Sequence, residues 1–197
     1  MKSLLFISLI FASSVSKAAL PPQFSECMKV DSSAMSIYDV KDIAKVAKVN
    51  YCQNQMGMTN KYDTIDLLKS RNVQVAISIG KTTYTREDLL EMAKAGPYLL
   101  YVDSNRIAKE YLAELSAAGV QLAVMSGSAG LAQADLMTLA KVKPYVYNVN
   151  SAVNKEDLKA LVGAGVNVVI RSNQSGLAKE DLVEVAKVNP DLLTFSP

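Results

Sequence analysis

Apolar residues along the chain alternate between a helical spacing and short continuous runs. Leu89, Met92 and Ala93 have the i, i+3, i+4 spacing of one helix face, and the same spacing returns from Leu136 and from Leu182. Between these helices lie runs of about five apolar, often β-branched residues, which predict short buried strands. The predicted strands are residues 73–77, 98–102, 120–124, 145–149, 166–170 and 192–195.

The helical half of this pattern is an internal repeat. Five leucines that open the helices, preceded in most copies by Asp or Glu, are spaced 23, 24, 22 and 24 residues apart. Weaker copies precede them at Val40 and Ile65. A fixed short period of this kind is the sequence signature of a repeat architecture. The five leucines are Leu89, Leu112, Leu136, Leu158 and Leu182.

Two kinds of unit alternate, so the true period is a pair of units of about 46 residues. In one kind a proline follows the leucine by eight residues and stops the helix. In the other kind Gly119 or Gly165 follows by seven residues, as expected of a residue that ends a helix in the left-handed conformation. The prolines are Pro97, Pro144 and Pro190.

Strands that alternate with helices on a short period must lie parallel to their neighbours. A closed eight-fold barrel typically takes about 250 residues, roughly 30 per unit, whereas these seven units have about 23 residues each. Units that cannot bury their own apolar face stack on one another. We therefore expect an α/β solenoid of about seven short helix–strand repeats, with a parallel sheet, over residues 39–197.

The recurring sequence resembles a known family. Residues 136–151, Leu-Met-Thr-Leu-Ala-Lys-Val-Lys-Pro-Tyr-Val-Tyr-Asn-Val-Asn-Ser, resemble the helix-rich leucine-rich repeats of F-box proteins, in which a helix ends near a proline before a short strand. The resemblance covers about four-fifths of the chain. Serines, at Ser104, Ser126, Ser151 and Ser172, stand where that family has an Asn or Cys ladder. The resemblance implies a non-catalytic binding scaffold.

The N-terminus predicts export. Lys2, an apolar run over residues 4–12 and the small residues before Ala18 have the layout of a signal peptide over residues 1–18. A buried N-terminal helix is the alternative. Residues 19–38 do not repeat, so we expect them to cap the first unit, because repeat arrays expose apolar surface at their ends. The expected compartment is the periplasm or the exterior.

Charge narrows the choice of partners. Removal of residues 1–18 leaves 19 basic and 19 acidic residues, without a basic cluster. A neutral chain of this kind is a poor partner for nucleic acid or for an anionic membrane surface. No later apolar segment reaches membrane-spanning length, so stable membrane insertion is not expected.

The chemical inventory is small. The chain has no His, which excludes Ser–His and Cys–His pairs and imidazole metal sites. Cys27 and Cys52 are too few for a metal site and predict one disulfide in an oxidising compartment. Neither a metal nor a cofactor is expected. Residues 127–130, Gly-Ser-Ala-Gly, lack the spacing of a phosphate-binding loop and are interpreted as a turn.

The outer face of the sheet is the candidate binding surface. If Leu100 and Val149 face the helices, strand alternation turns their neighbours outward. A register slip of one residue would exchange the two sets, and a merely solvated face is the alternative interpretation. The candidate binding residues are Tyr101, Asp103, Asn148, Asn150 and Arg171.

These observations favour a secreted or periplasmic module that is not an enzyme and binds protein or a cell-envelope component. Two alternatives remain: a glycan hydrolase that uses paired carboxylates, and a structural envelope protein. The predicted last strand leaves an open parallel edge, so self-association through it is also expected.

Overall fold

The computed structural model describes residues 27, 35–54, 60–171 and 174–196. The expected signal peptide over residues 1–18 lies outside the described residues. So does the expected cap segment 19–38, apart from Cys27 and residues 35–38. Within the described ranges no helix combines the length and the apolarity needed to cross a bilayer.

Helices and strands alternate along the described chain, as the repeat predicts. The helices are α1 (Ile37–Ala44), α2 (Lys61–Leu68), α3 (Arg86–Ala95), α4 (Lys109–Ala117), α5 (Gln133–Val142), α6 (Lys155–Gly163) and α7 (Lys179–Val188), with a short 3-10 turn η2 (Pro190–Leu192). The strands are β1 (Val49–Gln53), β2 (Val73–Ser78), β3 (Leu99–Val102), β4 (Gln121–Met125), β5 (Val146–Val149), β6 (Asn167–Arg171) and β7 (Leu193–Ser196).

The strands form one seven-stranded sheet in sequence order, and every neighbouring pair is parallel. The parallel α/β arrangement predicted from the sequence is therefore confirmed. Strand β1 was not among the predicted strands, because Asn50, Cys52 and Gln53 interrupt its apolar pattern. Its pairing with β2, over Val49–Gln53 of β1, makes it a strand despite that local pattern.

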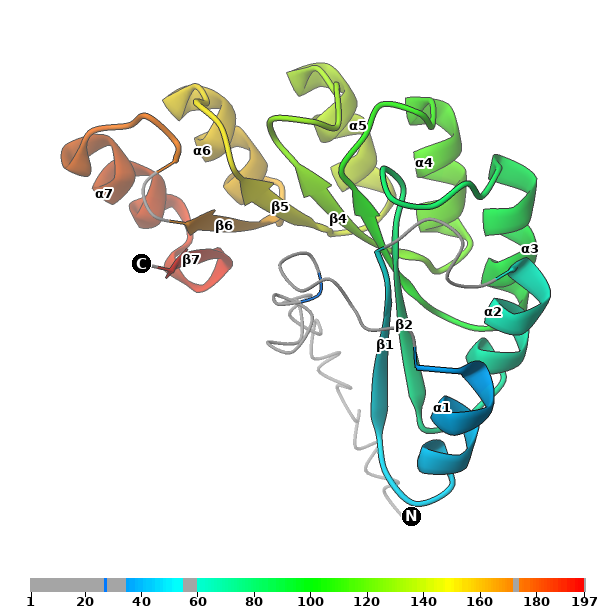
Figure 1. Ribbon diagram of the computed structural model, residues 1–197. Helices are drawn as coiled ribbons and strands as arrows, with labels where there is room; N and C mark the ends of the chain where they lie inside the picture. Colours follow the sequence, from blue (N-terminus) through cyan, green and yellow to red (C-terminus); the bar gives the residue numbers. More distant parts are fainter. Residues whose placement is uncertain (1–26, 28–34, 55–59, 172–173, 197) are drawn as a thin grey trace, which may run out of the picture.

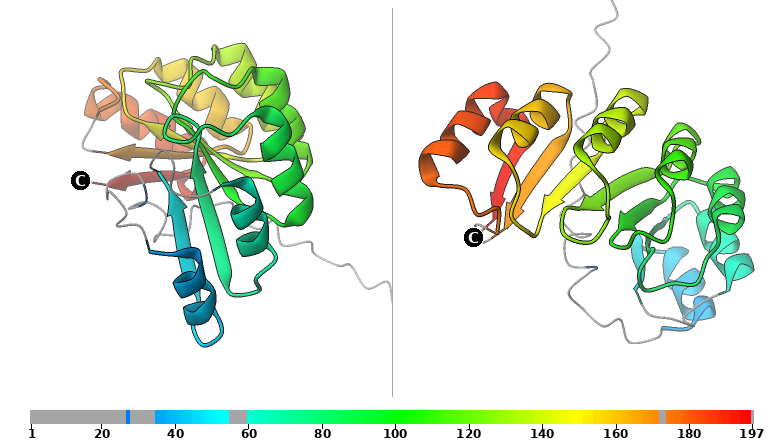
Figure 2. Two further views of the ribbon diagram at one scale, coloured as in Figure 1. Left: turned by 45° about the vertical axis from the view of Figure 1, so that its right-hand side comes forward. Right: turned by 90° about the horizontal axis from the view of Figure 1, so that it is seen from above.

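One row of helices covers one face of the sheet, and the sheet curves away from that row (Figures 1 and 2). The repeated leucines lie in this layer; Leu112, for example, is fully buried. We call the opposite face of the sheet the concave face. Figure 1 also shows that strand direction turns along the sheet, from near vertical at β1 and β2 to near horizontal at β6 and β7. This turning is the accumulated twist expected of adjacent strands.

The two kinds of unit end their helices in two ways. Gly119 and Gly165 have φ of 101° and 88°, so both adopt the left-handed backbone expected after a helix. In two of the three proline units a tyrosine follows the proline and bonds back to a carbonyl oxygen inside the helix. The Tyr98 hydroxyl donates to Leu89 O at 2.8 Å, and the Tyr145 hydroxyl donates to Leu136 O at 3.1 Å.

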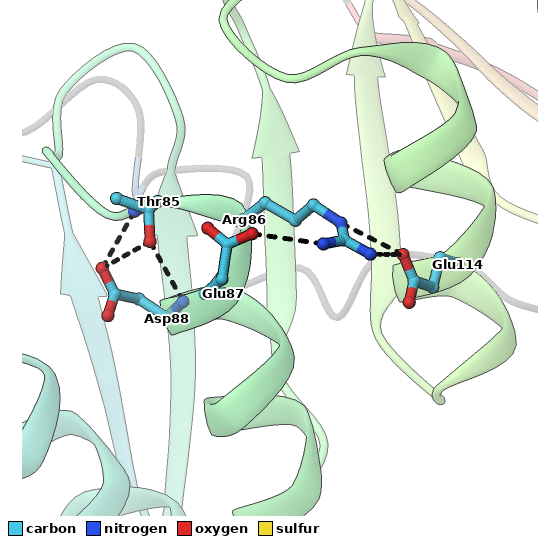
Figure 3. A network of polar contacts seen from close by, with 5 residues as sticks. All are labelled: Thr85, Arg86, Glu87, Asp88 and Glu114. Atoms are coloured by element: carbon cyan, nitrogen blue, oxygen red, sulfur yellow. Dashed lines mark hydrogen bonds and ion pairs between the residues drawn. The ribbon is translucent and has the colours of Figure 1, made fainter.

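Polar side chains at the helix starts fix each helix and link it to the next. At the start of α3 the Thr85 hydroxyl accepts from Asp88 N, and the Asp88 carboxylate accepts from Thr85 N (Figure 3). Arg86 crosses to Glu114 of α4, with Nη2 and Oε2 2.7 Å apart.

A regular ion-pair pattern links alternate helix pairs. The first residue of one helix, a lysine, reaches the aspartate at the third position of the next helix. The Nζ–Oδ1 distances are 3.1 Å for Lys61–Asp88, 2.6 Å for Lys109–Asp135 and 3.0 Å for Lys155–Asp181. We call this pattern the helix-start ladder. The aspartates of this ladder stabilise the fold, because they also lie at the N-termini of their helices, where the helix dipole favours negative charge.

Candidate functional site

The carboxyl ends of the strands and the concave face beside them form the candidate site. In parallel α/β proteins this edge carries ligands, because the loops that follow the strands converge there. The strand parity inferred from the sequence agrees with the structure. Leu100, Val102 and Val149 belong to the helix-side core, whereas Tyr101, Ala123 and Val146 belong to a second cluster on the concave face.

The amino-terminal part of the concave face is apolar and tied to Cys27. Cys27 and Cys52 form a disulfide, with their Cα atoms 5.6 Å apart, in the pairing expected from the sequence. Cys27 is buried in the same cluster as Ala76 and Leu99, and its carbonyl oxygen accepts a hydrogen bond from the Asn54 carboxamide. Polar residues of the face lie on both sides of this apolar cluster: Gln74, Gln121 and Asn167 at the amino ends of the strands, and Asn148 and Arg171 toward the carboxyl ends.

Tyr101 lies at the boundary between these two parts of the concave face. Its side chain is 3% exposed, and burial raises the pKa of its phenol well above the ordinary value, against a smaller lowering effect of the Arg171 guanidinium. The phenol is therefore neutral throughout the neutral pH range, so its hydroxyl keeps the proton that it can donate in a hydrogen bond.

Asn148 points into the concave face from the middle of β5. It is 5% exposed, and Met125 of β4 and Val169 of β6 are its partners across the sheet. Its carbonyl oxygen accepts from Ser126 N, but within the described ranges its side-chain carboxamide has no hydrogen-bond partner. The amide oxygen and nitrogen are not fully buried, so they can bind water or a ligand.

Arg171 supplies the positive charge of the site. It ends β6 two residues after Val169, on the same face, and therefore lies diagonal to Asn148 on the neighbouring strand. Diagonal neighbours of this kind are within reach of long side chains. Its charge also acts on Tyr101. Tyr101, Asn148 and Arg171 thus stand on one face of the sheet, with Arg171 diagonal to Asn148.

The other two candidates, Asp103 and Asn150, hold turns. Asp103 accepts from the Ser78 hydroxyl at 2.6 Å and from Gly80 N at 2.8 Å. Asn150, one double unit later, accepts from the Ser126 hydroxyl at 3.1 Å and from Gly127 N at 2.7 Å.

Both turns tie the end of one strand to the residue after the next strand. Gly127 N is thereby engaged, which agrees with a turn at residues 127–130 rather than a phosphate-binding loop. Sequence reasoning missed Ser78, although a serine closes the equivalent strand one double unit later at Ser126.

Paired carboxylates for glycan hydrolysis are missing from the described part of this edge. Asp103 is the only acid between the described strand ends and the helices that follow them. Both of its carboxylate oxygens are engaged in the turn. The acids at the helix starts lie on the helix layer, where Asp88, Asp135 and Asp181 pair with lysines. No group of three or more metal-ligating His, Cys, Asp or Glu side chains occurs within the described ranges.

Comparisons with known proteins return no family. No protein-family model matches the chain, and no curated protein matches it. Solved structures to which it is similar include QR15, an aldolase, at 11% identity and a TM-score of 0.35, covering 84% of this chain and 86% of that one.

Two further solved structures are similar at the same level. Oxaloacetate acetylhydrolase in complex with oxalate has 11% identity and a TM-score of 0.40, covering 88% of this chain and 78% of that one. The deoxyribose phosphate aldolase from Aeropyrum pernix has 11% identity and a TM-score of 0.36, covering 83% of this chain and 81% of that one.

These comparisons correct five of the predictions. The similar structures are aldolase- and lyase-type enzymes with barrel-like folds, so the resemblance to the leucine-rich repeats of F-box proteins is wrong. The protein-binding, non-catalytic module that this resemblance implied is wrong with it, and so is the assignment as no enzyme. The two alternative functions, a glycan hydrolase and a structural envelope protein, are wrong as well. The described strand ends also lack the second carboxylate that a glycan hydrolase needs. At 11% identity no activity is transferred from these enzymes to this chain.

Proposed function

We propose that the protein binds a small organic acid at the carboxyl-terminal part of the concave face, in a site of the kind that α/β enzymes carry. The ligand has a carboxylate and, next to it, a carbonyl or hydroxyl oxygen. The observation that carries the proposal is the Asn148 carboxamide, which lies on the concave face and has no hydrogen-bond partner within the described ranges. A ligand can hydrogen-bond this carboxamide in place of water.

The neighbouring groups define the ligand class. Arg171 has five N–H donors, so it can bind a carboxylate in addition to the interaction that it already makes. Asn148 can donate to a carbonyl or hydroxyl oxygen, and Tyr101, which also has an interaction of its own, stands on the same face. The apolar neighbours Ala123, Val146 and Val169 would contact the carbon atoms of the ligand. A neutral phenol held at low exposure is also suited to stabilise negative charge that develops on a carbonyl oxygen.

The proposal is tested by titrating isotope-labelled full chain with pyruvate, propionate and propanamide. Pyruvate has both recognised groups, propionate lacks the carbonyl and propanamide lacks the charge. We expect pyruvate to move the NMR resonances of the Asn148 side chain and to bind about tenfold more tightly than propionate, because one buried hydrogen bond is at stake. Propanamide should not bind.

Four variants sharpen the test. Asn148→Leu and Arg171→Met should each weaken pyruvate about tenfold. Gln121→Leu is the matched control, because Gln121 is a carboxamide on the same face at the opposite edge of the sheet, and its loss should change nothing. In Tyr101→Phe the infrared carbonyl stretch of bound pyruvate should move to higher frequency. Unchanged pyruvate affinity in Asn148→Leu would exclude the site.

We propose further that the architecture is an incomplete barrel rather than an extended solenoid. The turning of strand direction in Figure 1 supports this, because barrel strands are tilted and staggered, whereas straight stacking needs little accumulated twist. The units were too short to predict a complete eight-stranded barrel, and the sheet ends at β1 and β7. We propose that β7 pairs with a second copy. Sedimentation that shows monomers at all concentrations would contradict this pairing.

Export is also proposed. The apolar N-terminal run and the Cys27–Cys52 disulfide support it, since stable disulfides belong to oxidising compartments. Cell fractionation with N-terminal sequencing tests it. We expect a mature chain that begins at Ala19 outside the cytoplasm, and an uncleaved cytoplasmic chain would contradict the assignment.

A further inference from the structure

The apolar core on the helix side of the sheet is open at one end of the described row of units. Helix α7 and strand β7 are the last in this row (Figures 1 and 2). Leu89 of α3 and Leu136 of α5 are buried, whereas Leu182 of α7, which has the same place in the repeat, is only partly buried. The repeat therefore indicates that α7 lacks the cover that α3 and α5 have.

Strand β7 shows the same lack of cover. In the sheet register Phe195 of β7 is the partner of Ile170 of β6, and Ile170 is the partner of Val149 of β5. Ile170 and Val149 are each 1% exposed, but Phe195 is 50% exposed. Among the described strands β7 pairs only with β6. An exposed aromatic side chain beside an unpaired strand edge is a typical place for association with another chain.

Helix α7 also exposes an apolar residue on its open side. Asp181 and Glu184 face α6, because both pair with Lys155. Val183 lies two residues after Asp181, about 200° farther around the helix, and therefore on the side away from α6. It is 45% exposed, whereas Met137, the equivalent residue of α5, packs against the core.

The charges beside Val183 are complementary to a reversed copy of themselves. Glu180, Val183 and Lys187 have the i, i+3, i+7 spacing of one helix stripe. Within the described ranges neither Glu180 nor Lys187 has an ion-pair partner. They lie on opposite sides of Val183, about 10 Å apart along the helix axis. A parallel copy of this stripe would place like charges together, but an antiparallel copy places each acid beside a base.

We propose that two copies of the chain associate about a two-fold axis that passes between their α7 helices and between their β7 strands. This inference rests on the β7 pairing proposed above and adds its symmetry and its helix contacts. Val183 of one copy contacts Val183 of the other copy, and Phe195 becomes covered. Glu180 of each copy lies beside Lys187 of the other copy. A two-fold interface uses the same patch on both copies, as this stripe requires.

The dimensions of the last unit fit one axis. Antiparallel pairing of two β7 strands about an axis perpendicular to the sheet keeps both helix layers on the same side, so the two α7 helices become neighbours. Helix α7 has ten residues and is about 15 Å long. Strand β7 has four residues and is about 13 Å long. A single axis can therefore pass near the middle of both elements.

The test is sedimentation velocity of the full chain over a wide concentration range. We expect monomers and dimers without larger species. Lys187→Glu should weaken the dimer about tenfold, because two attractive pairs become two repulsive ones, and Glu180→Lys should do the same. The double variant should recover the parent affinity. Lys141→Glu is the matched control, because Lys141 is exposed at the same position of α5, and its change should leave the dimer unaffected.

Cross-linking locates the axis. A short bismaleimide should join two copies of Val183→Cys into a covalent dimer, because residue 183 of each copy lies next to the axis. Cys27 and Cys52 do not react, since they form a disulfide. Val142→Cys is the control, because Val142 is 43% exposed and lies on α5, away from the proposed interface. It should give no covalent dimer.

Each outcome decides between arrangements. Monomers at all concentrations would overturn both this inference and the β7 pairing. Species that grow beyond dimers would show head-to-tail contact and exclude the two-fold axis. Dimers whose affinity does not respond to the single charge changes, or is not recovered in the double variant, would exclude the α7 contact and leave only the β7 pairing. Pyruvate binding at the concave face is measured separately, so failure of that site is distinguishable from failure of the dimer.

Discussion

Asp103 allows the sharpest test of how the strand-end turns are held. Its carboxylate joins β3 to the turn after β2 through the Ser78 hydroxyl and Gly80 N. The perturbation is Asp103→Ala, which removes both acceptors and leaves the backbone unchanged. Asp103→Asn is the matched variant, because the equivalent turn one double unit later is held by the amide oxygen of Asn150.

The two donors that Asp103→Ala leaves behind differ in exposure. Ser78 is 1% exposed, so its hydroxyl proton finds no water in the variant. Gly80 is exposed, so its N–H recovers a water partner. Hydrogen bonds to charged groups contribute about 1.5–3 kcal/mol each, and an orphaned buried donor costs most of that amount. We therefore expect Asp103→Ala to lower the free energy of unfolding by about 2 kcal/mol, most of it through Ser78.

The carboxamide of Asp103→Asn retains one good acceptor and should lose about 1 kcal/mol or less. The assay is urea unfolding followed by circular dichroism, with Ser78→Ala and the double variant completing a double-mutant cycle. The coupling between Ser78 and Asp103 should be about 1–2 kcal/mol. A coupling near zero, or equal losses for Asp103→Ala and Asp103→Asn, would refute the assignment of Asp103 to the turn.

Three further predictions concern the scaffold. Replacing Cys27 and Cys52 by Ser should lower the free energy of unfolding by about 3.5 kcal/mol, the loop-entropy value for their separation of 25 residues, and parent chain unfolded with reductant should show the same loss. Gly165→Ala should cost about 1 kcal/mol through backbone strain alone, since φ is 88° and a Cβ there meets nothing within 4 Å; equal urea midpoints would contradict this. Asp88, whose pKa is lowered chiefly by its hydrogen bond from Thr85 N, stabilises the fold above the ordinary Asp pKa. Stability should therefore fall as pH drops through and below that value, and Asp88→Asn should flatten this part of the curve.

The sequence was sufficient to predict most helices and strands and to predict which strand residues share a face of the sheet. Helical spacing from Leu89 and the glycines at 119 and 165 follow from local chemistry, and strand parity then assigned Tyr101 and Asn148 to one face. The overall form did not follow, because the twist between neighbouring strands accumulates from the packing of the whole sheet and leaves no mark in one unit. Short units therefore favoured a solenoid of stacked repeats, and the resemblance to leucine-rich repeats, which is wrong, supported the same prediction.

The candidate site was predictable only in part, for a related reason. Asp103 and Asn150 share a face with Tyr101, yet each is held by the turn that follows a neighbouring strand. The alternation of side chains along a strand predicts the face of the sheet to which a side chain belongs. It does not predict which hydrogen-bond donor lies near that side chain at the end of the strand. Ser78 and Gly80 come from a unit about 25 residues away, so their pairing with Asp103 needs the parallel register.

A repeat gives each position its own internal comparison, which separates scaffold from site. Where a role recurs, as with Tyr98 and Tyr145 or with the ladder lysines, the fold alone explains the residue. Where one copy departs without a local structural role, the fold does not explain it. Asn148 departs in this way, since it stands where Tyr101 stands one double unit earlier and its carboxamide has no hydrogen-bond partner within the described ranges. Asn148 therefore deserves the first binding experiment.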